Sequence, residues 1–379
     1  MNITILRETA PGERRIPLIP ASAEKLIKLG AELHVENGLA SAIGIPDREY
    51  EKHGAKVFHD RAAALAGADL VLRLRKPLAE DIPHLKKGAL HVSYLDPFNE
   101  PALIRQLASS GVSAFSLELI PRSTIAQKMD VLSSQANLAG YVAVVLAAQR
   151  LDKIFPMMST PSGTIAPARV FIIGAGVAGL QAIATAKRLG AIVEAFDTRP
   201  VVEEQVKSLG ARFVKVDLGE TGQTKDGYAK ALTEEQLAKQ REAMARHCAG
   251  ADVVISTAQV FGKRAPRIIT ADMVKGMKPG SIVVDLAVET GGNVEGSRLD
   301  EEVDVNGVRI LGLGNLPGRV PVHASQMFSS NLVNFVEHFW DKTAKSFALR
   351  LDDEIIKGSL VTHGGAVVHP LIKPLVEGS

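Results

Sequence analysis

The sequence predicts an α/β protein made of two doubly wound, parallel-sheet domains that are joined by two long helices, with a cleft between the domains. Strand-like apolar runs alternate with helix-like segments in both halves of the chain. Long apolar helical patterns interrupt this alternation from about 133 to 151 and at 324–340, and core packing is expected for the residues that recur at helical spacing in the second of them: Met327, Phe328, Leu332, Phe335 and Phe339. A chain of 379 residues is also too long for one ordinary core.

The N-terminal domain is expected to comprise residues 1–136 together with 328–379, and the second domain residues 137–327. The expected strands of the N-terminal domain include 3–6, 32–35, 70–74, 89–92 and 113–115, with helices at 21–29, 61–66 and 102–109. The tail, with apolar runs at 356–361 and 366–368 around two glycines, is interpreted as a hairpin that returns to this domain.

The second domain contains a glycine-rich turn in a complete structural context. The turn reads Gly174-Ala175-Gly176-Val177-Ala178-Gly179, and it joins the apolar run 169–173 to an Ala-rich helical pattern. In such a turn the first glycine permits the tight bend, the second lets the backbone approach a pyrophosphate, and the third lets the helix pack on the strand. Free N–H groups at the helix start favour an anion. The pattern therefore indicates a Rossmann-like dinucleotide-binding domain.

The residue at the end of the next strand indicates which dinucleotide is bound. The run 192–196 ends at Asp197, where a carboxylate can accept hydrogen bonds from the adenosine ribose and repel a 2′-phosphate. NAD is therefore favoured over NADP, although Arg199 could soften that preference. The alternative is a glycine-rich turn that binds no ligand.

Composition excludes several other classes of function. A net charge of +2 and an aromatic content of 4% argue against nucleic-acid binding. The single cysteine, Cys248, is expected to be a buried structural thiol, and neither metal-ligand spacing nor a Gly-x-Ser-x-Gly nucleophile motif is found. The most apolar longer run, 139–148, is too short to span a bilayer, which predicts a soluble, cytoplasmic chain. Redox chemistry through bound nicotinamide is favoured.

A polar segment lies between the two expected domains. Arg122, Gln127, Asp130 and Ser133 offer a cation, an amide, a carboxylate and a hydroxyl within a short stretch. These groups suit the binding of a carboxamide and a ribose better than the breaking of a covalent bond. The alternative is a polar loop that only caps the following helix.

Other polar residues follow expected strands. Arg15, Lys76 and Asp96 follow strands of the N-terminal domain, and we expect them to converge on the cleft. Asp285 and Asn315 are expected near the same crevice. The alternative for each of these residues is a solvated loop charge.

Three stretches give the chain a resemblance to a known family. They are 122–141, Phe155-Pro156-Met157-Met158 and 176–191, and the likeness extends to Asp285-Leu286-Ala287-Val288-Glu289, Gly291-Gly292-Asn293 and Gly227-Tyr228-Ala229-Lys230. The chain resembles the NAD(H)-binding component (domain I) of proton-translocating, Re/Si-specific NAD(P) transhydrogenase, within the alanine dehydrogenase/transhydrogenase superfamily. This resemblance implies a homodimer that binds NAD(H). It also implies an NADP(H)-binding partner subunit that exchanges hydride with it, and a membrane-spanning partner subunit that couples the transfer to proton translocation and holds the chain at the inner membrane.

The resemblance also implies roles for individual residues. Arg122, Gln127, Asp130 and Ser133 would position the nicotinamide and its ribose, and Asp197 would bind the adenosine ribose. Tyr228 would lie on a mobile loop that closes over the nucleotide. Further nucleotide contacts are expected at the glycine turn and at Thr198, Arg199, Thr257, Ala258, Gln259 and Asn315.

Two other functions remain open at this point. Alanine dehydrogenases share the resemblance, and Arg15 and Lys76 lie where that family binds its substrate. That family also needs a histidine as acid–base partner, and Asp96 stands at the matching position, which puts amino-acid dehydrogenation in doubt. A non-catalytic NAD-sensing module is the third possibility, and it would bind NADH without any hydride transfer.

Overall fold

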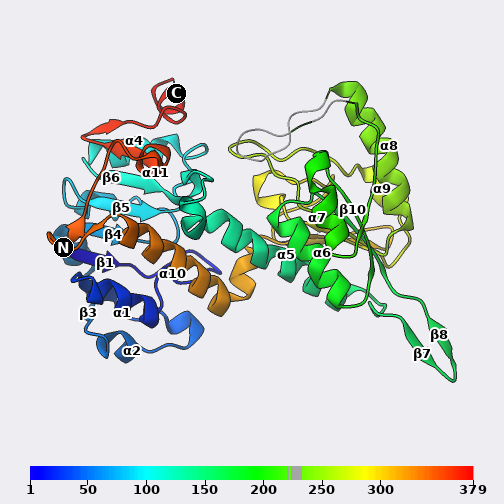
Figure 1. Ribbon diagram of the computed structural model, residues 1–379, viewed down its shortest axis with the longest axis horizontal. Coiled ribbons are helices and arrows are strands. Elements are labelled where there is room, and N and C mark those ends of the chain that lie inside the picture. Colours follow the sequence, from blue (N-terminus) through cyan, green and yellow to red (C-terminus); the bar gives the residue numbers. More distant parts are fainter. Residues whose placement is uncertain (220–221, 223–232, 379) are drawn as a thin grey trace. The chain divides into compact units, whose positions relative to one another are not determined.

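The computed structural model describes residues 1–219, 222 and 233–378, and its chain divides into two compact units (Figure 1). The first unit comprises Met1–Gln135 and Gly318–Ser379, and the second comprises Ala136–Pro317. The sequence suggested a return to the first domain at 328, whereas the first unit already resumes at Gly318. Helix α10 (Pro321–His338) explains the difference, because its first turns also attach to the first unit: the Ser325 hydroxyl oxygen accepts a hydrogen bond from the Ile16 N–H at 2.9 Å.

The first unit is built on a sheet with the order β19-β18-β6-β5-β4-β1-β2-β3. Its strands are β1 (Asn2–Ile5), β2 (Glu32–Glu36), β3 (Lys56–Phe58), β4 (Leu70–Leu72), β5 (Leu90–Ser93), β6 (Ser113–Ser116), β18 (Leu360–His363) and β19 (Ala366–Val367). Strands β1–β6 pair in parallel, while β18 and β19 add an antiparallel edge. The chain reverses its winding between β1 and β4, as in a doubly wound fold.

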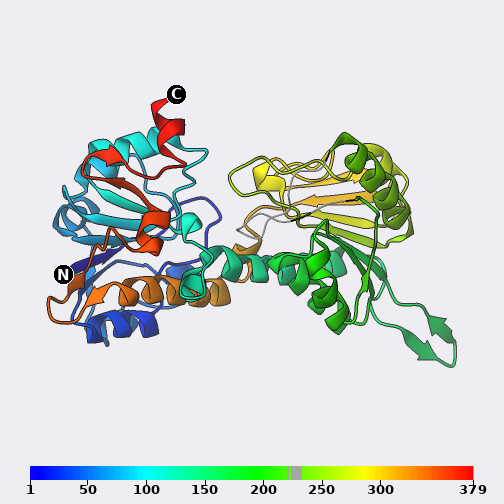
Figure 2. The ribbon, with the colours of Figure 1, turned by 45° about the horizontal axis from the view of Figure 1, so that its top comes forward.

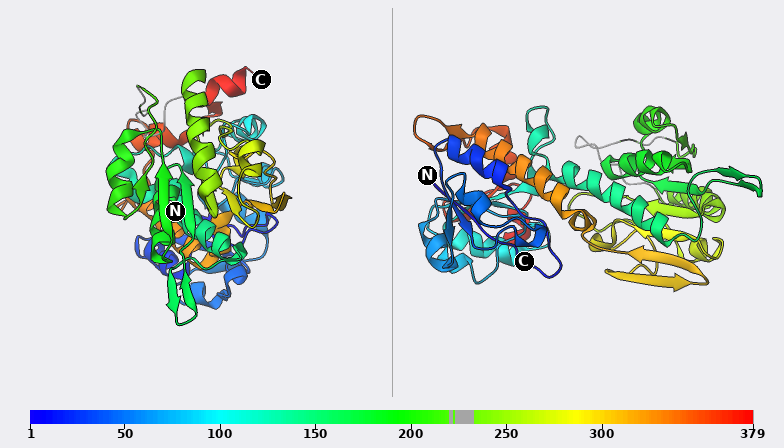
Figure 3. Two further views of the ribbon diagram at one scale, coloured as in Figure 1. Left: turned by 90° about the vertical axis from the view of Figure 1, so that its right-hand side faces the viewer. Right: turned by 90° about the horizontal axis from the view of Figure 1, so that it is seen from below.

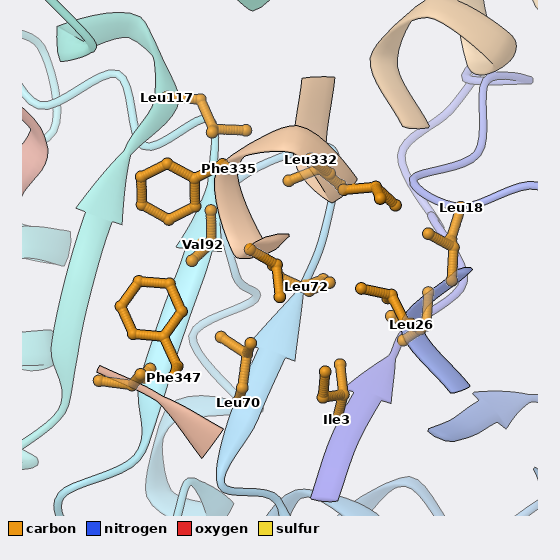
Figure 4. Packing of buried hydrophobic residues seen from close by; sticks show 14 of the residues in the cluster. Ile3, Leu18, Leu26, Leu70, Leu72, Val92, Leu117, Leu332, Phe335 and Phe347 are labelled. Atoms are coloured by element: carbon orange, nitrogen blue, oxygen red, sulfur yellow. The ribbon is translucent and has the colours of Figure 1, made fainter. Parts of the chain in front are cut away.

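Helices flank the sheet of the first unit, and most of them turn an apolar face toward it. They are α1 (Pro20–Lys28), α2 (Arg48–Glu51), α3 (Arg61–Gly67), α4 (Pro101–Ser109), α10, α11 (Glu354–Ser359) and α12 (Lys373–Glu377). Helices α1 and α10 lie side by side in the views of Figures 2 and 3. In Figure 4, Leu332 and Phe335 of α10 meet Leu72 and Val92 of the central strands. All four side chains are fully buried, so apolar burial holds α10 against the sheet.

Two sequence-based expectations for the first unit were wrong. Residues 356–359, expected in a strand, form the end of α11, and the hairpin is limited to β18 and β19 around Gly364 and Gly365. Met327, expected in the core at helical spacing, is 41% exposed, because it faces away from the buried stripe of α10. A short pair, β16 (Trp340–Asp341) with β17 (Ser346–Phe347), was not expected.

The second unit has the sheet order β11-β10-β9-β12-β13-β15-β14. Its strands are β9 (Arg169–Ile173), β10 (Ile192–Phe196), β11 (Arg212–Phe213), β12 (Val253–Ser256), β13 (Ile282–Asp285), β14 (Glu301–Val305) and β15 (Val308–Gly312), and its helices are α6 (Val177–Arg188), α7 (Glu203–Ser208), α8 (Glu234–Gly250) and α9 (Ala271–Lys275). All strands of this sheet pair in parallel except β14, which is antiparallel to β15. The expected α/β, parallel-sheet architecture is confirmed.

Strand β14 and a hairpin in the second unit were not predicted. Strand β14 carries three acidic residues and lies at the sheet edge, and only its Val303 and Val305 pack against the core, which is too short an apolar pattern to predict a strand. The hairpin of β7 (Met158–Thr160) and β8 (Gly163–Ile165) extends away from the rest of its unit (Figure 2). All of its strand residues are exposed. Its stability must therefore come from backbone pairing, or from a surface outside the chain.

Helix α5 (Val131–Arg150) crosses the boundary between the units at Gln135 and Ala136. By length and apolar composition it qualifies as a membrane-spanning helix, the single such helix within the described ranges. Nearly half of its apolar window is buried in the protein. At Gly140 the helix comes so close to α6 that an added Cβ would lie 2.1 Å from the Ala178 carbonyl oxygen. Helix α5 therefore packs closely against α6 at Gly140, while Tyr141 and Val145 on the same helix remain exposed.

Candidate functional site

Strand register brings the candidate nucleotide residues to one edge of the second sheet. Ile173 at the end of β9 is aligned with Phe196 of β10 and with Ser256 of β12. The residues that follow these strand ends, Gly174, Asp197 and Thr257, are therefore neighbours at the carboxyl edge. This edge is where open α/β sheets bind ligands, at the strand where the winding reverses.

The glycine turn is tight, and two of its three glycines, Gly174 and Gly179, cannot be replaced by larger residues without strain or a steric clash. Gly174 has a φ of +94°, a backbone conformation that other residues rarely adopt. A Cβ on Gly179 would lie 1.8 Å from the Gly174 carbonyl oxygen, so the helix can approach the turn only with glycine there. The Thr257 hydroxyl donates a hydrogen bond to the Gly174 carbonyl oxygen at 3.1 Å, which ties the next strand end to the turn.

Gly176 differs from these two glycines, because the space beside it is open. It is the N-cap residue of the twelve-residue helix α6 and makes no side-chain cap. Apart from its own chain neighbours, a Cβ added there would meet no described heavy atom closer than Arg199 Nη2, at 4.0 Å. The first N–H groups of α6 and the positive end of its dipole thus border open space, which suits a phosphate group.

Asp197 accepts four hydrogen bonds in this structure. Its Oδ2 accepts from the Ala175 N–H and from Arg199 Nη2, both at 2.7 Å, and its Oδ1 accepts from the Arg199 N–H and Nε, both at 2.9 Å. The hydrogen bond and charge of Asp197, working against burial, raise the pKa of the Arg199 guanidinium. A carboxylate has about four lone-pair sites, so Arg199 and the Ala175 N–H together occupy the acceptor positions of Asp197.

The loop after β12 is held by Asn293, a residue that the sequence indicated only as a member of a motif. Asn293 is fully buried, and its Nδ2 donates to the Ala258 and Pro266 carbonyl oxygens, each at 2.8 Å. Gln259 Nε2 donates to the Leu286 carbonyl oxygen at 3.2 Å. Asn293 thus fixes both ends of the segment that carries Ala258 and Gln259. An Asn directly after two glycines was the sequence signal for this role.

The structure gives Asp285 and Asn315 structural partners. The fully buried Asp285 carboxylate accepts hydrogen bonds from the backbone N–H groups of Ala287, Asn293 and Val294, at 3.0–3.1 Å. It therefore stabilises the 286–294 turn. Asn315, which has a φ of +44°, donates its N–H to Glu289 at 3.2 Å.

The polar segment of the first unit combines buried anchors with outward-facing groups. Ala126, Met129 and Val131 are fully buried, whereas Gln127 is exposed. Asp130 precedes α5 and accepts hydrogen bonds from the Ser133 N–H at 2.9 Å and from the Ser133 hydroxyl at 2.6 Å. Asp130 therefore caps α5, as the capping alternative for this loop predicted.

Three further residues expected at the nucleotide site are Arg122, Thr198 and Tyr228. Arg122 is exposed, and the half-buried Thr198 follows Asp197 in the second unit. Tyr228 lies outside the described residues.

The two cations that resemble a dehydrogenase substrate site, Arg15 and Lys76, each pair with an acidic residue of the first unit. Arg15 donates to Glu13 through Nε at 2.9 Å and Nη2 at 2.7 Å, and to Gln135 through Nη1 at 3.0 Å. Burial alone would raise the pKa of Glu13, but hydrogen bonds and charge from Arg15, with help from Arg75, lower it to about 2. Lys76 pairs with Glu100.

Asp96 is exposed, and both its side chain and its backbone are hydrogen-bonded: its Oδ1 accepts from Asn99 Nδ2 at 2.7 Å. It has a φ of +49°, and its N–H donates to the buried Glu118 carboxylate at 2.8 Å. Burial, despite that hydrogen bond, raises the pKa of Glu118. Cys248 is buried, and desolvation raises the pKa of its thiol to about 12, so the expectation of a structural thiol is confirmed.

Two family models match the two halves of this chain. The model for the N-terminal domain of alanine dehydrogenase/PNT matches residues 4–139, and the model for the C-terminal domain matches residues 143–370. The chain belongs to the alanine dehydrogenase/PNT family. Both halves of the architecture are therefore those of the family.

Within this family, the transhydrogenase branch is the more similar. The first part of NAD(P) transhydrogenase subunit alpha of Rhodospirillum rubrum is 43% identical across 98% of this chain and 99% of its own length. The crystal structure of transhydrogenase from Sinorhizobium meliloti matches with a TM-score of 0.84 at 43% identity, covering 98% of this chain and all of that one.

The alanine dehydrogenase branch shares the fold at lower identity. Alanine dehydrogenase of Halomonas elongata is 29% identical across 97% of this chain and 95% of its own length. This chain is thus an alanine dehydrogenase/PNT family member whose transhydrogenase relatives are the nearer of these two groups.

Proposed function

We propose that this chain is the NAD(H)-binding subunit of a Re/Si-specific, proton-translocating NAD(P) transhydrogenase. The observation that carries the proposal is the Gly174–Gly179 turn, which presents the open N-terminus of α6 beside Asp197 at the carboxyl edge of the sheet. The donor set there fits a dinucleotide. Helix N–H groups suit the pyrophosphate, and the carboxylate suits the ribose hydroxyls.

The nucleotide preference follows from charge. Asp197 would bind the adenosine ribose of NAD(H) once Arg199 moves aside, and its negative charge disfavours a 2′-phosphate. We propose further contacts from the turn residues Gly174, Ala175, Gly176, Val177, Ala178 and Gly179 and from Thr198, Arg199, Tyr228, Thr257, Ala258, Gln259 and Asn315. NADP(H) would bind to a partner subunit.

The chemical step would need alignment rather than acid–base catalysis. Bound NADH supplies a hydride, which would pass directly to the nicotinamide of the partner subunit. Arg122, Gln127, Asp130 and Ser133 would orient the nicotinamide carboxamide and its ribose. A preorganised loop suits this role, since transfer between two bound cofactors depends on contact geometry and on exclusion of water.

The first unit supports this assignment over amino-acid dehydrogenation. A substrate carboxylate at Arg15 would have to displace Glu13, whose side chain has no exposed surface and whose depressed pKa keeps it ionised. Breaking a buried ion pair in this way is costly. Asp96 also stands where that reaction needs a histidine. A non-catalytic NAD-sensing module would share the turn, and only a hydride-transfer assay separates it from the proposed subunit.

The proposed assembly is a homodimer with NADP(H)-binding and membrane-spanning partner subunits, in the cytoplasm at the inner membrane. Support comes from relatives whose names describe them as the first part of subunit alpha, which implies further parts. Several large apolar side chains of the second unit are also exposed, among them Tyr141, Val145, Ile154, Met157, Met158, Ile165, Leu189 and Ile192. We propose that some of them contact the second copy of the chain or a partner subunit.

The test is an optical assay in two arms. In the first, the chain, NADH and an NADP(H)-binding transhydrogenase subunit are mixed with an NADP⁺ analogue whose reduced form absorbs at its own wavelength. In the second, pyruvate and ammonium replace the partner and the analogue. We expect turnover only in the first arm. Turnover only in the second would establish an alanine dehydrogenase, and NADH binding without turnover in either arm would establish a sensing module.

A further inference from the structure

Two asparagine side chains of α10 hold the backbone of the polar loop. Asn331 Nδ2 and Asn334 Nδ2 donate to the Lys128 carbonyl oxygen at 2.8 and 3.0 Å. The two residues are three positions apart, so they lie on one face of the helix. Lys128 lies directly after Gln127 and two residues before Asp130, the two residues proposed to align the nicotinamide.

Asn331 also forms a hydrogen bond with Ser134, in the first turn of α5 beyond Asp130. Its Oδ1 accepts a hydrogen bond from the Ser134 hydroxyl at 2.7 Å, a shorter contact than the 3.1 Å from that hydroxyl to the Val131 carbonyl oxygen. One amide therefore bonds the chain on both sides of Asp130. Asn331 is only 7% exposed, and a buried amide is stable only when its polar atoms are paired.

These bonds lie where the local backbone pattern is irregular. A short 3-10 helix (Ala126–Met129) ends at Asp130, which has an extended ψ of 94°, and α5 begins at the next residue. The carbonyl groups at such a break lack regular helical partners. Asn331 and Asn334 supply donors for the Lys128 carbonyl group, and these bonds restrict the loop to one backbone conformation.

We propose that Asn331, supported by Asn334, is a positioning residue for the hydride transfer proposed above. The clamp formed by Asn331, Asn334, Lys128 and Ser134 fixes the backbone between Gln127 and Asp130, while the buried Ala126, Met129 and Val131 anchor it from below. Neither asparagine needs to touch the nucleotide. This inference rests on the proposed function for its catalytic meaning, but the clamp itself can be tested without any partner.

The decisive variant is Asn331→Asp, which keeps the size and the acceptor for Ser134 but removes the donor to Lys128. We expect faster hydrogen exchange of the 123–134 backbone amides in the full chain without nucleotide. With NADH and the NADP(H)-binding subunit, we expect single-turnover hydride transfer to slow by about tenfold or more, since small misplacements are costly in such a step. The NADH dissociation constant, measured by calorimetry, should change by less than about threefold, because alignment and anchoring are separate contributions.

Ser134→Ala and Asn334→Ala each remove one hydrogen bond of the clamp and should give smaller effects of the same kind. If Asn331→Asp does not fold, these two variants test the clamp in its place. Met327→Ala, on the exposed side of the same helix, is the matched control and should behave as the wild type.

Unchanged hydrogen exchange of the loop amides in all clamp variants would overturn the clamp. Faster exchange with unchanged transfer, or a parallel fall in transfer, NADH affinity and melting temperature, would overturn the positioning role. A wild type that transfers no hydride would refute the proposed function instead, whatever the exchange data show.

Discussion

The Asp197 carboxylate and the Arg199 guanidinium face each other as a two-pronged ion pair at the end of β10. Nε donates to Oδ1 at 2.9 Å, and Nη2 donates to Oδ2 at 2.7 Å. The Asp197 side chain is 6% exposed and the Arg199 side chain 14%, so the pair is shielded from water. A ribose that binds Asp197 must displace the arginine side chain, which links nucleotide affinity to this one contact.

Replacing Asp197 by alanine should weaken NADH binding by about tenfold or more, since hydrogen bonds to a charged acceptor are lost. The gap between NADH and NADPH affinity should narrow, because the repulsion of the 2′-phosphate disappears. Arg199→Ala should widen that gap, since it removes the nearby positive charge. Calorimetric titration of both nucleotides measures these effects, and an unchanged NADH affinity in Asp197→Ala would remove this carboxylate from the site.

Gly176→Ala and Gly179→Ala should separate binding from folding. An alanine at Gly176 has room in the ligand-free protein, so the melting temperature should stay near that of the wild type while NADH binding is lost. The Cβ of an alanine at Gly179 would lie 1.8 Å from the Gly174 carbonyl oxygen, so this substitution should lower both the melting temperature and the NADH affinity. Thermal melts paired with calorimetry test this contrast. Normal NADH binding by Gly176→Ala would show that the pyrophosphate does not approach this turn.

Gly140→Ala should destabilise the protein although it lies in a helix, where alanine usually helps. The new methyl group would meet the Ala178 carbonyl oxygen at 2.1 Å, so α5 and α6 must move apart. Overpacking of this kind costs about 1–3 kcal/mol. Gly250→Ala, at the end of α8 with open space beside it, is the control and should be neutral or slightly stabilising. Urea unfolding of both variants provides the comparison, and equal stability would contradict the close contact.

Gln127→Asn and Asp130→Asn should slow hydride transfer far more than they weaken NADH binding. An asparagine at 130 keeps an oxygen that can accept from the Ser133 N–H, so the start of α5 should stay intact. Single-turnover rates and NADH affinity are compared for each variant. Losses of equal size in both quantities would assign these residues to anchoring rather than alignment.

The Glu13–Arg15 pair should make the free energy of unfolding fall as the pH becomes acidic. The pKa of Glu13 falls from an ordinary value of 4.5 to about 2 in the folded chain, so its contribution is complete above 4.5 and disappears as the pH falls towards 2. The stability difference between the wild type and Glu13→Gln should therefore be largest at neutral pH, about 3 kcal/mol from the shift, and shrink below pH 4.5. Urea unfolding at several pH values measures it. A difference that does not vary with pH would mean that the ion pair is not the source.

Local sequence patterns predicted much of the second unit. The run 169–173 and the strand 192–196 match β9 and β10 residue for residue, because buried parallel strands are continuous apolar runs bounded by turns. The glycine turn was also predicted, since Gly174 and Gly179 answer local steric demands, whereas Gly176 has open space beside it. The charged β14 and the exposed hairpin β7–β8 could not be predicted in this way, because β14 offers only Val303 and Val305 to the core and every strand residue of the hairpin is exposed.

The sequence alone determined the two α/β halves, the dinucleotide turn and the acid that follows β10, because these depend on neighbours within a few residues. Only the tertiary structure decided that Arg199 covers Asp197, that Glu13 engages Arg15, and that Asn331 spans Asp130. It also decided that Gly140 must be small, since the atom it would strike belongs to Ala178. Partners of this kind are chosen by three-dimensional proximity and by the need to pair buried polar atoms, and no local pattern records that choice.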